Sequence, residues 1–284
     1  MKAIPTTRRS RQRAFTLVEA LISISIVTAV LGMTMSTFLM SMRTMYKDSQ
    51  RLATNASLRS FMAKISKETL DASFYYLFDY YTKLDGSVNI DTDYATLDQD
   101  ADFADSAYDK WVAHGDCLVL VTKTSKYRTT DIRQIRIFYR RTKNQAQRNT
   151  DAPLRYYETA DWGEGTAGAS NGHPVEDLED ELNAINLNAG TTGNNYTATG
   201  LAYNPAATDF AGSTLLSLRT RGRAVPSPYT PYAAGDLFPV FSTESGSANA
   251  TNGFVSINIE FINGTTVTNL LSSSSFNYTI SPRR

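Results

Sequence analysis

The chain has 284 residues, which is long enough for one large domain or two small ones. Five of its 28 basic residues and none of its 28 acidic residues lie in residues 1–14, so the remainder has 23 basic against 28 acidic residues, a net charge of −5. That charge argues against a surface that coats nucleic acid, and the single cysteine, Cys117, excludes an internal disulfide.

Residues 15–42 form an apolar run that contains one charged residue, Glu19, and no proline. As an α-helix this run is roughly 42 Å long, which exceeds the ~30 Å hydrocarbon core of a bilayer. A carboxylate in lipid costs about 2.5–3.5 kcal/mol at the centre of a helix and less near the interface. The run therefore predicts a membrane-spanning helix in which Glu19 needs a partner.

The residues at the start of this run resemble a known family. Residues 14–19 read AFTLVE and follow a basic leader, which resembles the type III signal of type IV pilins and of the pseudopilins of type II secretion. The resemblance covers about 45 residues. It implies that a prepilin peptidase cuts between Ala14 and Phe15, that Phe15 is then N-methylated, and that Glu19, fifth in the mature chain, serves assembly. The family usually has Gly before the cut, where this chain has Ala14.

Two other interpretations explain less of the run. A cleaved secretory signal has an apolar region of about 7–15 residues followed by an A-x-A-like site. The run here is longer, and no such site follows it. A plain membrane anchor explains the length but leaves the motif and its acid unexplained.

The resemblance also implies a location and partners. The protein is expected in the bacterial inner membrane as a single-pass protein with a cytoplasmic N-terminus and a periplasmic C-terminal domain, and then in a pilus or pseudopilus. The expected partners are other pilin or pseudopilin subunits, prepilin peptidase, the inner-membrane assembly platform and membrane lipid. No cofactor is expected, and nucleic acid is not favoured as a partner.

The helix is predicted to continue beyond the apolar run, from about Phe15 to about Ala72. Neither Gly nor Pro, the two strongest helix breakers, occurs between Gly32 and Gly86. One apolar stripe with helical spacing is formed by Leu58, Phe61, Met62 and Ile65. The expected parts of the chain are a cleaved leader (1–14), a transmembrane or filament-core helix (15–42), its amphipathic continuation (43–72) and a globular domain (73–284).

Gly32 is the only glycine in the apolar run. A glycine costs ~1 kcal/mol relative to alanine inside a helix, and the Ser and Thr residues that follow are modest helix formers. Filaments of the family often have an unwound stretch in this part of the helix, commonly near a proline, which this chain lacks. Residues 32–37 are thus a candidate for unwinding; the alternative is that Gly32 allows close helix packing.

The globular domain is predicted to be α+β, with the helix packed on an antiparallel sheet as in pilins. Residues 74–81 contain six aromatic residues in eight, which are expected in the core because exposed patches of that size are rare without a partner. Cys117 is expected to be a buried residue at the start of a strand. Strands are predicted over residues 118–121, 134–139, 154–158, 255–261 and 276–280, with a hairpin turn at Asn263-Gly264.

An acidic stretch, residues 91–109, contains a weak candidate for a calcium loop. The spacing of a calcium loop is matched by Asp98, Asp100, Asp102 and Asp109. The position that needs glycine for its sharp turn is Phe103, and the last position is Asp where a bidentate Glu is usual. A solvated acidic loop without a metal is the preferred interpretation.

Residues 159–214 contain eight of the 16 glycines and only one segment with a helical pattern, Val175 to Leu187. They are expected to form an irregular insertion on the exposed face. No catalytic motif is present, and the two histidines, His114 and His173, lack the spacing of a triad or metal site.

The leading functional hypothesis is a structural subunit, a minor pilin or pseudopilin, and not an enzyme. The alternatives are a filament-borne adhesin or DNA-uptake module that uses residues 159–214, and an anchored periplasmic enzyme. The sequence leaves pilus and secretion filament open.

Overall fold

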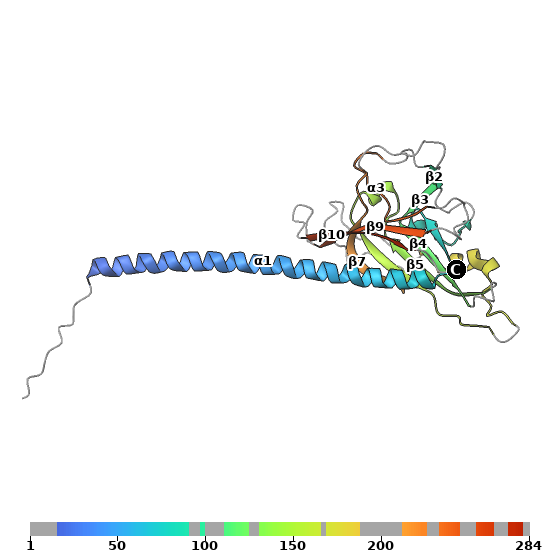
Figure 1. The fold of residues 1–284 in the computed structure, drawn as a ribbon, viewed down its shortest axis with the longest axis horizontal. Helices are drawn as coiled ribbons and strands as arrows, with labels where there is room; N and C mark the ends of the chain where they lie inside the picture. Colours follow the sequence, from blue (N-terminus) through green and yellow to red (C-terminus); the bar gives the residue numbers. More distant parts are fainter. Residues whose placement is uncertain are drawn as a thin grey trace, which may run out of the picture. The chain divides into compact units, whose positions relative to one another are not determined.

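The computed structural model describes residues 16–90, 97–99, 111–124, 131–165, 169–187, 212–225, 233–244, 254–263 and 272–280. The chain divides into two compact units, Met1–Ser49 and Gln50–Arg284. Helix α1, Leu17–Asp71, supplies the described part of the first unit and the beginning of the second (Figure 1). The predicted long N-terminal helix is therefore confirmed, and it passes through Gly32 without a break.

The second unit is built on one sheet of ten strands, all paired antiparallel. The strand order is β1-β4-β5-β6-β7-β9-β8-β3-β2, in which β7 and β8 pair with successive parts of β9. Strand β10 lies outside this order and pairs with β9. The strands are β1 Phe74–Phe78, β2 Leu97–Gln99, β3 Trp111–Gly115, β4 Cys117–Lys123, β5 Ile132–Arg140, β6 Ala152–Glu158, β7 Thr214–Arg221, β8 Phe241–Glu244, β9 Phe254–Asn263 and β10 Ser272–Ile280.

Both faces of the central strands are buried. In β4, Leu118 and Leu120 face one hydrophobic cluster, whereas Cys117, Val119 and Val121 face a second. A strand with water on one face would alternate apolar and polar residues, but a strand covered on both faces is apolar at every position. The continuous apolar run in the sequence therefore has its cause in the two layers that cover the sheet.

The last turns of α1 form the first layer. Leu58, Phe61 and Ile65 are at most 8% exposed and pack in the first cluster with residues of the sheet. The Phe61 ring contacts Phe138 and Phe261 at centroid distances of 6.2 and 5.5 Å. The apolar stripe read from the sequence is thus the face of the helix that packs on the sheet, and the predicted α+β, pilin-like fold is confirmed.

Polar contacts also tie this part of α1 to the sheet. The Nε atom of Arg136 in β5 lies 2.8 Å from Oε2 of Glu68, and both side chains are at most 15% exposed. The Nζ atom of Lys64 lies 3.4 Å from the centre of the Tyr156 ring in β6, a cation–π contact. These pairs fix the rotation of the helix on the sheet face.

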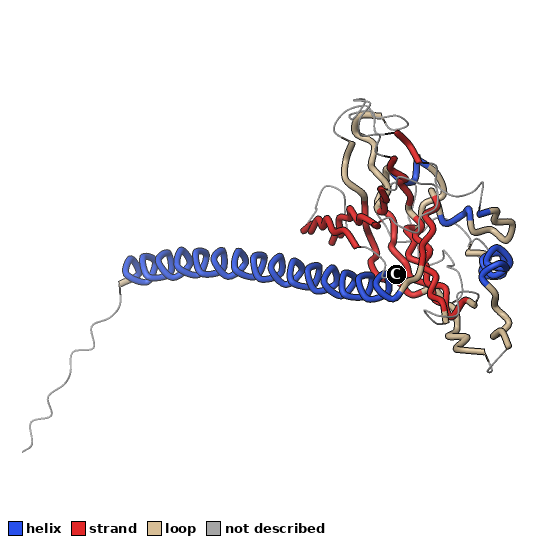
Figure 2. The backbone as a smooth tube through the Cα atoms, turned by 45° about the vertical axis from the view of Figure 1, so that its right-hand side comes forward, coloured by secondary structure: helices blue, strands red, loops and turns tan. Residues whose placement is uncertain are grey.

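Helix α4, Leu178–Ile185, forms the second layer on the opposite side of the strands (Figure 2). A short 3₁₀ turn, η3 (Val175–Asp177), precedes it. Its residues Leu178, Leu182 and Ile185 are buried in the second cluster. The helical segment predicted within residues 159–214 is therefore real, but it is part of the core and not only of an exposed insertion. Residues 166–168 and 188–211 lie outside the described part.

The aromatic run and Cys117 lie in the core as predicted. Tyr75, Phe78 and Tyr81 are at most 1% exposed, so the run is not an adhesive surface. Cys117 is fully buried at the start of β4, and burial raises the pKa of its thiol well above its ordinary value. The thiol is therefore protonated and unreactive at neutral pH.

The predicted turn at Asn263-Gly264 is wrong. Strands β9 and β10 do form a hairpin pair, but Asn263 is paired with Ser272 and is therefore a strand residue, and Gly264 lies outside the described residues. An Asn-Gly pair is a local turn signal, whereas the register of two strands follows the packing of their alternate side chains. Packing along the length of the strands extends the pairing past the local signal.

A buried charge network joins segments that are distant in the sequence. Asp116, between β3 and β4, is fully buried; its Oδ2 accepts hydrogen bonds from Thr142 Oγ1 at 2.8 Å and from Arg148 Nε at 3.2 Å. The same oxygen lies 3.5 Å from Nη1 of Arg140, which is also fully buried. Its Oδ1 accepts the backbone N–H of Val240 at 3.0 Å. One carboxylate thus connects β4, β5, the short helix α3 (Gln145–Arg148) and the segment before β8.

The remaining donors of the network are also satisfied. The Arg140 guanidinium donates to the carbonyl oxygens of Arg148, Thr150 and Thr220. Burial lowers the pKa of Arg140, and the charge of Asp116 opposes that shift. Asp116 forms an ion pair with both arginines, at 3.5 Å from Arg140 Nη1 and 3.2 Å from Arg148 Nε.

We predict that Asp116→Asn lowers the free energy of unfolding by about 3–5 kcal/mol, because it leaves two buried guanidinium groups without their counter-ion. The measurement is urea unfolding of the full chain in detergent, followed by near-UV circular dichroism. Asp161→Asn is the matched control, because it breaks the Arg133–Asp161 pair, whose side chains are 49% and 47% exposed, and costs at most about 1 kcal/mol. Equal losses in the two variants would contradict the prediction.

Candidate assembly site

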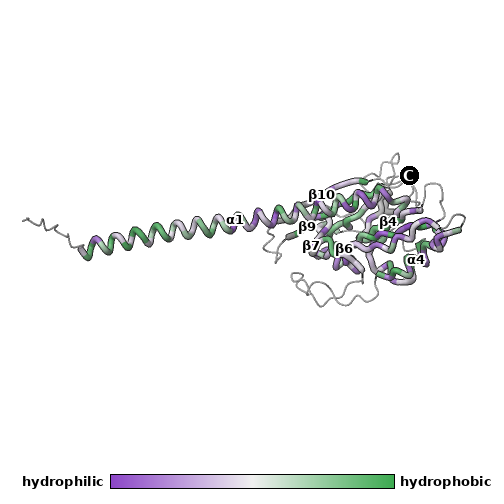
Figure 3. Tube along the Cα trace, turned by 90° about the horizontal axis from the view of Figure 1, so that it is seen from below, coloured by the Kyte–Doolittle hydropathy of each residue, from purple (hydrophilic) through white to green (hydrophobic). Residues whose placement is uncertain are grey.

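The first part of α1, from Leu17 to Met45, is apolar and exposed. Every large hydrophobic side chain between Leu17 and Met45 is at least 47% exposed. Within the described residues, α1 is the one helix long and apolar enough to cross a membrane, and none of its most apolar window is buried (Figure 3, green). A helix with this surface is stable only when lipid or other protein covers it.

Six hydroxyl groups of this segment are satisfied within the helix. Each of these six donates to the carbonyl oxygen four residues earlier, at 2.7–3.0 Å: Ser23, Ser25, Thr28, Thr34, Thr37 and Thr44. An unpaired hydroxyl is costly in a medium without water, and this bond removes the cost. The Ser and Thr content of the run is therefore compatible with lipid or a filament core.

The start of the helix is closed by Thr16 and Glu19. The Glu19 Oε2 atom accepts hydrogen bonds from the backbone N–H and from the hydroxyl of Thr16, both at 3.1 Å. In return, the backbone N–H of Glu19 donates to Thr16 Oγ1 at 3.3 Å. This is a capping box, in which two unpaired helix N–H groups are satisfied reciprocally. The carboxylate also lies at the positive end of the helix dipole.

The sequence interpretation missed the capping box, although its signal was visible. The segment Thr16-Leu17-Val18-Glu19 has the T-x-x-E spacing of such a box, and it stands directly before an apolar run. From the sequence, Glu19 needs a cationic partner, and the amine of Phe15 on the same or a neighbouring subunit is the candidate. The structure shows that Thr16 is a local partner within the same chain.

The other predicted site residues are Ala14, Phe15 and Gly32. Ala14 and Phe15 lie outside the described residues. Gly32 stands within the unbroken helix, and a Cβ atom at this position would have nothing within 4 Å. The helix is regular through Thr37 in the isolated chain.

The acidic stretch contains no metal site in its described part. Asp98 lies in β2, paired with Val112 of β3. Asp100, Asp102 and Asp109 lie outside the described residues. Within the described ranges, no group of three or more His, Cys, Asp or Glu side chains is arranged to hold a metal ion.

The two histidines have separate structural contacts. The His114 ring stacks on Phe238 at a centroid distance of 5.6 Å. The His173 ring stacks on Trp162 at 3.8 Å, and its Nδ1 lies 2.6 Å from Oε1 of Glu181. The described contacts of both rings are packing and hydrogen-bonding contacts, and they bring no nucleophile to either histidine.

Comparison with known proteins gives one match. A family model described as the prokaryotic N-terminal methylation motif matches residues 9–35, which include the capping box and the beginning of the apolar helix. No curated protein and no solved structure matches the chain significantly. The match falls on the residues that resemble a prepilin-type signal, and the fold is a long apolar helix followed by an antiparallel sheet that packs on its last turns. The chain is therefore a type IV pilin- or pseudopilin-like protein with a prepilin-type N-terminal signal.

Proposed function

We propose that the protein is a structural subunit, a minor pilin or pseudopilin, that is inserted in the inner membrane and then assembled into a filament. The observation that carries this proposal is the bare apolar surface of α1, directly after the methylation motif. The same surface is stable in lipid before assembly and against neighbouring helices afterwards. Proteins of this kind are typically structural and not enzymatic.

The size of the domain favours a subunit present in few copies. Cleavage after Ala14 leaves 270 residues. A bulky domain disfavours the dense helical repetition of a major subunit, so we assign the protein to a minor or tip position. The adhesin or DNA-uptake alternative receives no support from the described part of residues 159–214, because α4 is used to cover the sheet.

The first prediction from this proposal concerns processing. The basic leader stays in the cytoplasm by the positive-inside rule, and prepilin peptidase cuts there between Ala14 and Phe15. Mass spectrometry of protein extracted from membranes should give a chain that begins with N-methylated Phe15. Cells without the peptidase are the control and should retain Met1. A chain with an intact leader in cells with active peptidase would contradict the proposal.

The second prediction concerns the charge of Glu19. Inside a bundle of apolar helices a carboxylate is tolerated when a cation pairs with it, and the amine of Phe15 on the same or a neighbouring subunit is the available cation. Methylation preserves the charge of that amine. Removing one partner of a buried pair costs about 3–5 kcal/mol. We therefore expect Glu19→Ala to be cleaved and inserted in the membrane but poorly incorporated into filaments.

Two variants separate the effect of the Glu19 charge on assembly from the effect of the capping box. Glu19→Gln keeps an acceptor for Thr16 and removes the charge, because Gln also serves in capping boxes. Thr16→Val keeps the charge and removes the hydroxyl of the cap. Quantitative immunoblotting of sheared filaments should show strong loss for Glu19→Gln and a smaller loss for Thr16→Val. The reverse order would show that capping, and not ion pairing, is what assembly requires.

The third prediction concerns Gly32. In lipid the helix should remain continuous, because unpaired backbone groups are too costly there. Among neighbouring helices in a filament, residues 32–37 are expected to unwind, since their hydroxyls can bond the released backbone groups. A density map of assembled filaments is the measurement. Continuous helical density through Thr37 would restrict Gly32 to close helix packing.

A further inference from the structure

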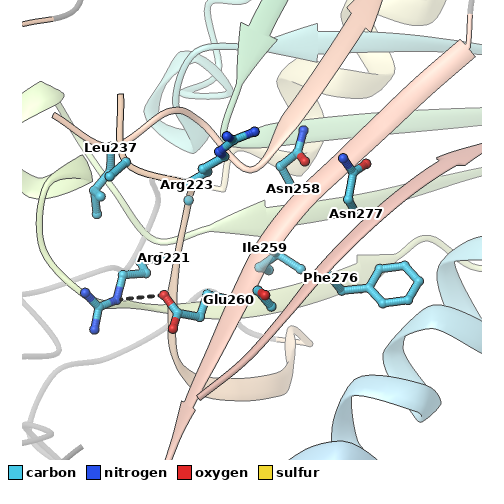
Figure 4. Close-up of a pocket in the computed structure, with 11 residues that line it drawn as sticks. Arg221, Arg223, Leu237, Asn258, Ile259, Glu260, Phe276 and Asn277 are labelled. Carbon is cyan, nitrogen blue, oxygen red and sulfur yellow. Dashed lines mark ion pairs between the residues drawn. The ribbon is translucent and has the colours of Figure 1, made fainter. Parts of the chain in front are cut away.

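The second unit contains an open pocket of about 610 Å³, which we name the β9–β10 pocket (Figure 4). It lies over the outward face of β9 and β10, beside the segment that follows β7. Its polar and rim residues are Arg221, Arg223, Leu237, Asn258, Glu260 and Asn277. The volume falls in the range of about 300–1,000 Å³ that is usual for small-molecule sites.

The backbone that carries Arg223 is held rigidly. Arg223 O accepts the N–H of Phe238 at 2.9 Å, and Ala224 forms a bridge with Leu237. At Gly222 a Cβ atom would lie 1.7 Å from the carbonyl oxygen of Phe238, so only glycine allows this close approach. The exposed Arg223 side chain therefore projects from a fixed point beside the sheet.

The charges of the described residues that line the pocket, together with Asp151 and Arg219 of the same ion-pair network, sum to one positive charge. Asp151 pairs with Arg219 at 2.5 Å and with Arg221 at 3.4 Å, and Arg221 also lies 3.3 Å from Glu260. These four charges cancel. No hydrogen bond or ion pair from another described residue reaches the Arg223 guanidinium, so Arg223 is the uncompensated charge of the pocket.

Two side-chain amides stand next to this charge. Asn258 and Asn277 are direct cross-strand partners of β9 and β10. Figure 4 shows their amides side by side, with the Arg223 side chain directed toward Asn258. Among the described residues, neither amide has a hydrogen-bond partner. Each offers both donors and an acceptor.

We propose that the β9–β10 pocket binds a saccharide that bears a carboxylate. The planar guanidinium of Arg223 matches a carboxylate in a bidentate way, and the paired amides match neighbouring hydroxyl groups, which also donate and accept. The single excess charge matches one carboxylate group better than a phosphate, which carries about −1.5 to −2 charges at pH 7.

The backbone of β9 argues against a peptide that adds to this strand. A peptide that adds to a sheet needs a free strand edge. Here β9 is paired with β10 on one edge, and the N–H of Asn258 on the other edge donates to Val240 O at 2.8 Å. A ligand that lies on the face of β9 is therefore recognised by side chains, which suits a saccharide.

The test is a binding titration of the full chain in detergent micelles, with digalacturonic acid as the probe. The comparison ligands are the neutral disaccharide of galactose, the acidic peptide acetyl-Glu-Glu and inorganic phosphate. We expect digalacturonate to bind at least about ten-fold more tightly than each of them, with affinity falling as salt rises. Arg223→Gln should weaken this binding at least about ten-fold, whereas Arg59→Gln, which removes an exposed charge on α1, should not change it.

A second variant guards against an effect on folding. Asn277→Asp deletes no atoms of the pocket but places a negative charge beside the expected carboxylate, so it should abolish binding while the circular dichroism spectrum is unchanged. Four outcomes would overturn the proposal: no saturation up to about 10 mM digalacturonate, equal binding of the neutral sugar, tighter binding of the peptide or phosphate, or full binding by Arg223→Gln. Filament assembly should be unaffected in both pocket variants, so this test is independent of the assembly proposal.

Discussion

The arrangement of the sheet domain depends on the buried carboxylate of Asp116. Its contacts reach Val240, 124 residues further along the chain, and both arginines that neutralise it come from other segments. Exported domains often join such distant segments with disulfides, but the one cysteine here is buried and alone. A charge network differs from a disulfide because it stabilises only the folded state, where water is excluded and every donor has its acceptor. The strands around it must therefore form together for any of these contacts to be favourable.

Helix α1 combines two chemical surfaces in one continuous element. Its last turns have one apolar stripe, and the sheet covers that stripe. Its first part is apolar and exposed within the described residues, and a surface of this kind is stable when lipid or other protein covers it. Gly32 costs little helix stability in such a surrounding, because a medium without water gives the backbone no alternative hydrogen-bond partners. The helix can thus remain regular in one environment and still contain a segment with weak helical preference.

Most of the fold could be predicted from local patterns, because periodicity reports which faces of an element are covered. The helical spacing of Leu58, Phe61 and Ile65 and the alternation in β9 both gave the correct faces. The Asn263-Gly264 turn failed because the strand pairing continues past a local signal. The Asp116 network could not have been predicted, since its members are charged residues without spacing, brought together only by the sheet topology. The β9–β10 pocket could not have been predicted either, because Arg223 and Asn277 come from segments that only the sheet topology brings together. The capping box of Thr16 and Glu19 could be predicted from the T-x-x-E spacing, because such a box is a local sequence signal.

The cap and the proposed ion pair of Glu19 are compatible and need not compete. An ionised carboxylate has two oxygens with about four acceptor positions, and the capping box uses one oxygen, Oε2, for its two bonds to Thr16. The other oxygen remains available to a cation. The cap holds the side chain in one conformation at the start of the helix, so a neighbouring amine would meet a fixed acceptor and less side-chain entropy would be lost on pairing. The residue that makes the helix costly to insert is in this way also the residue that the cap orients for the proposed ion pair.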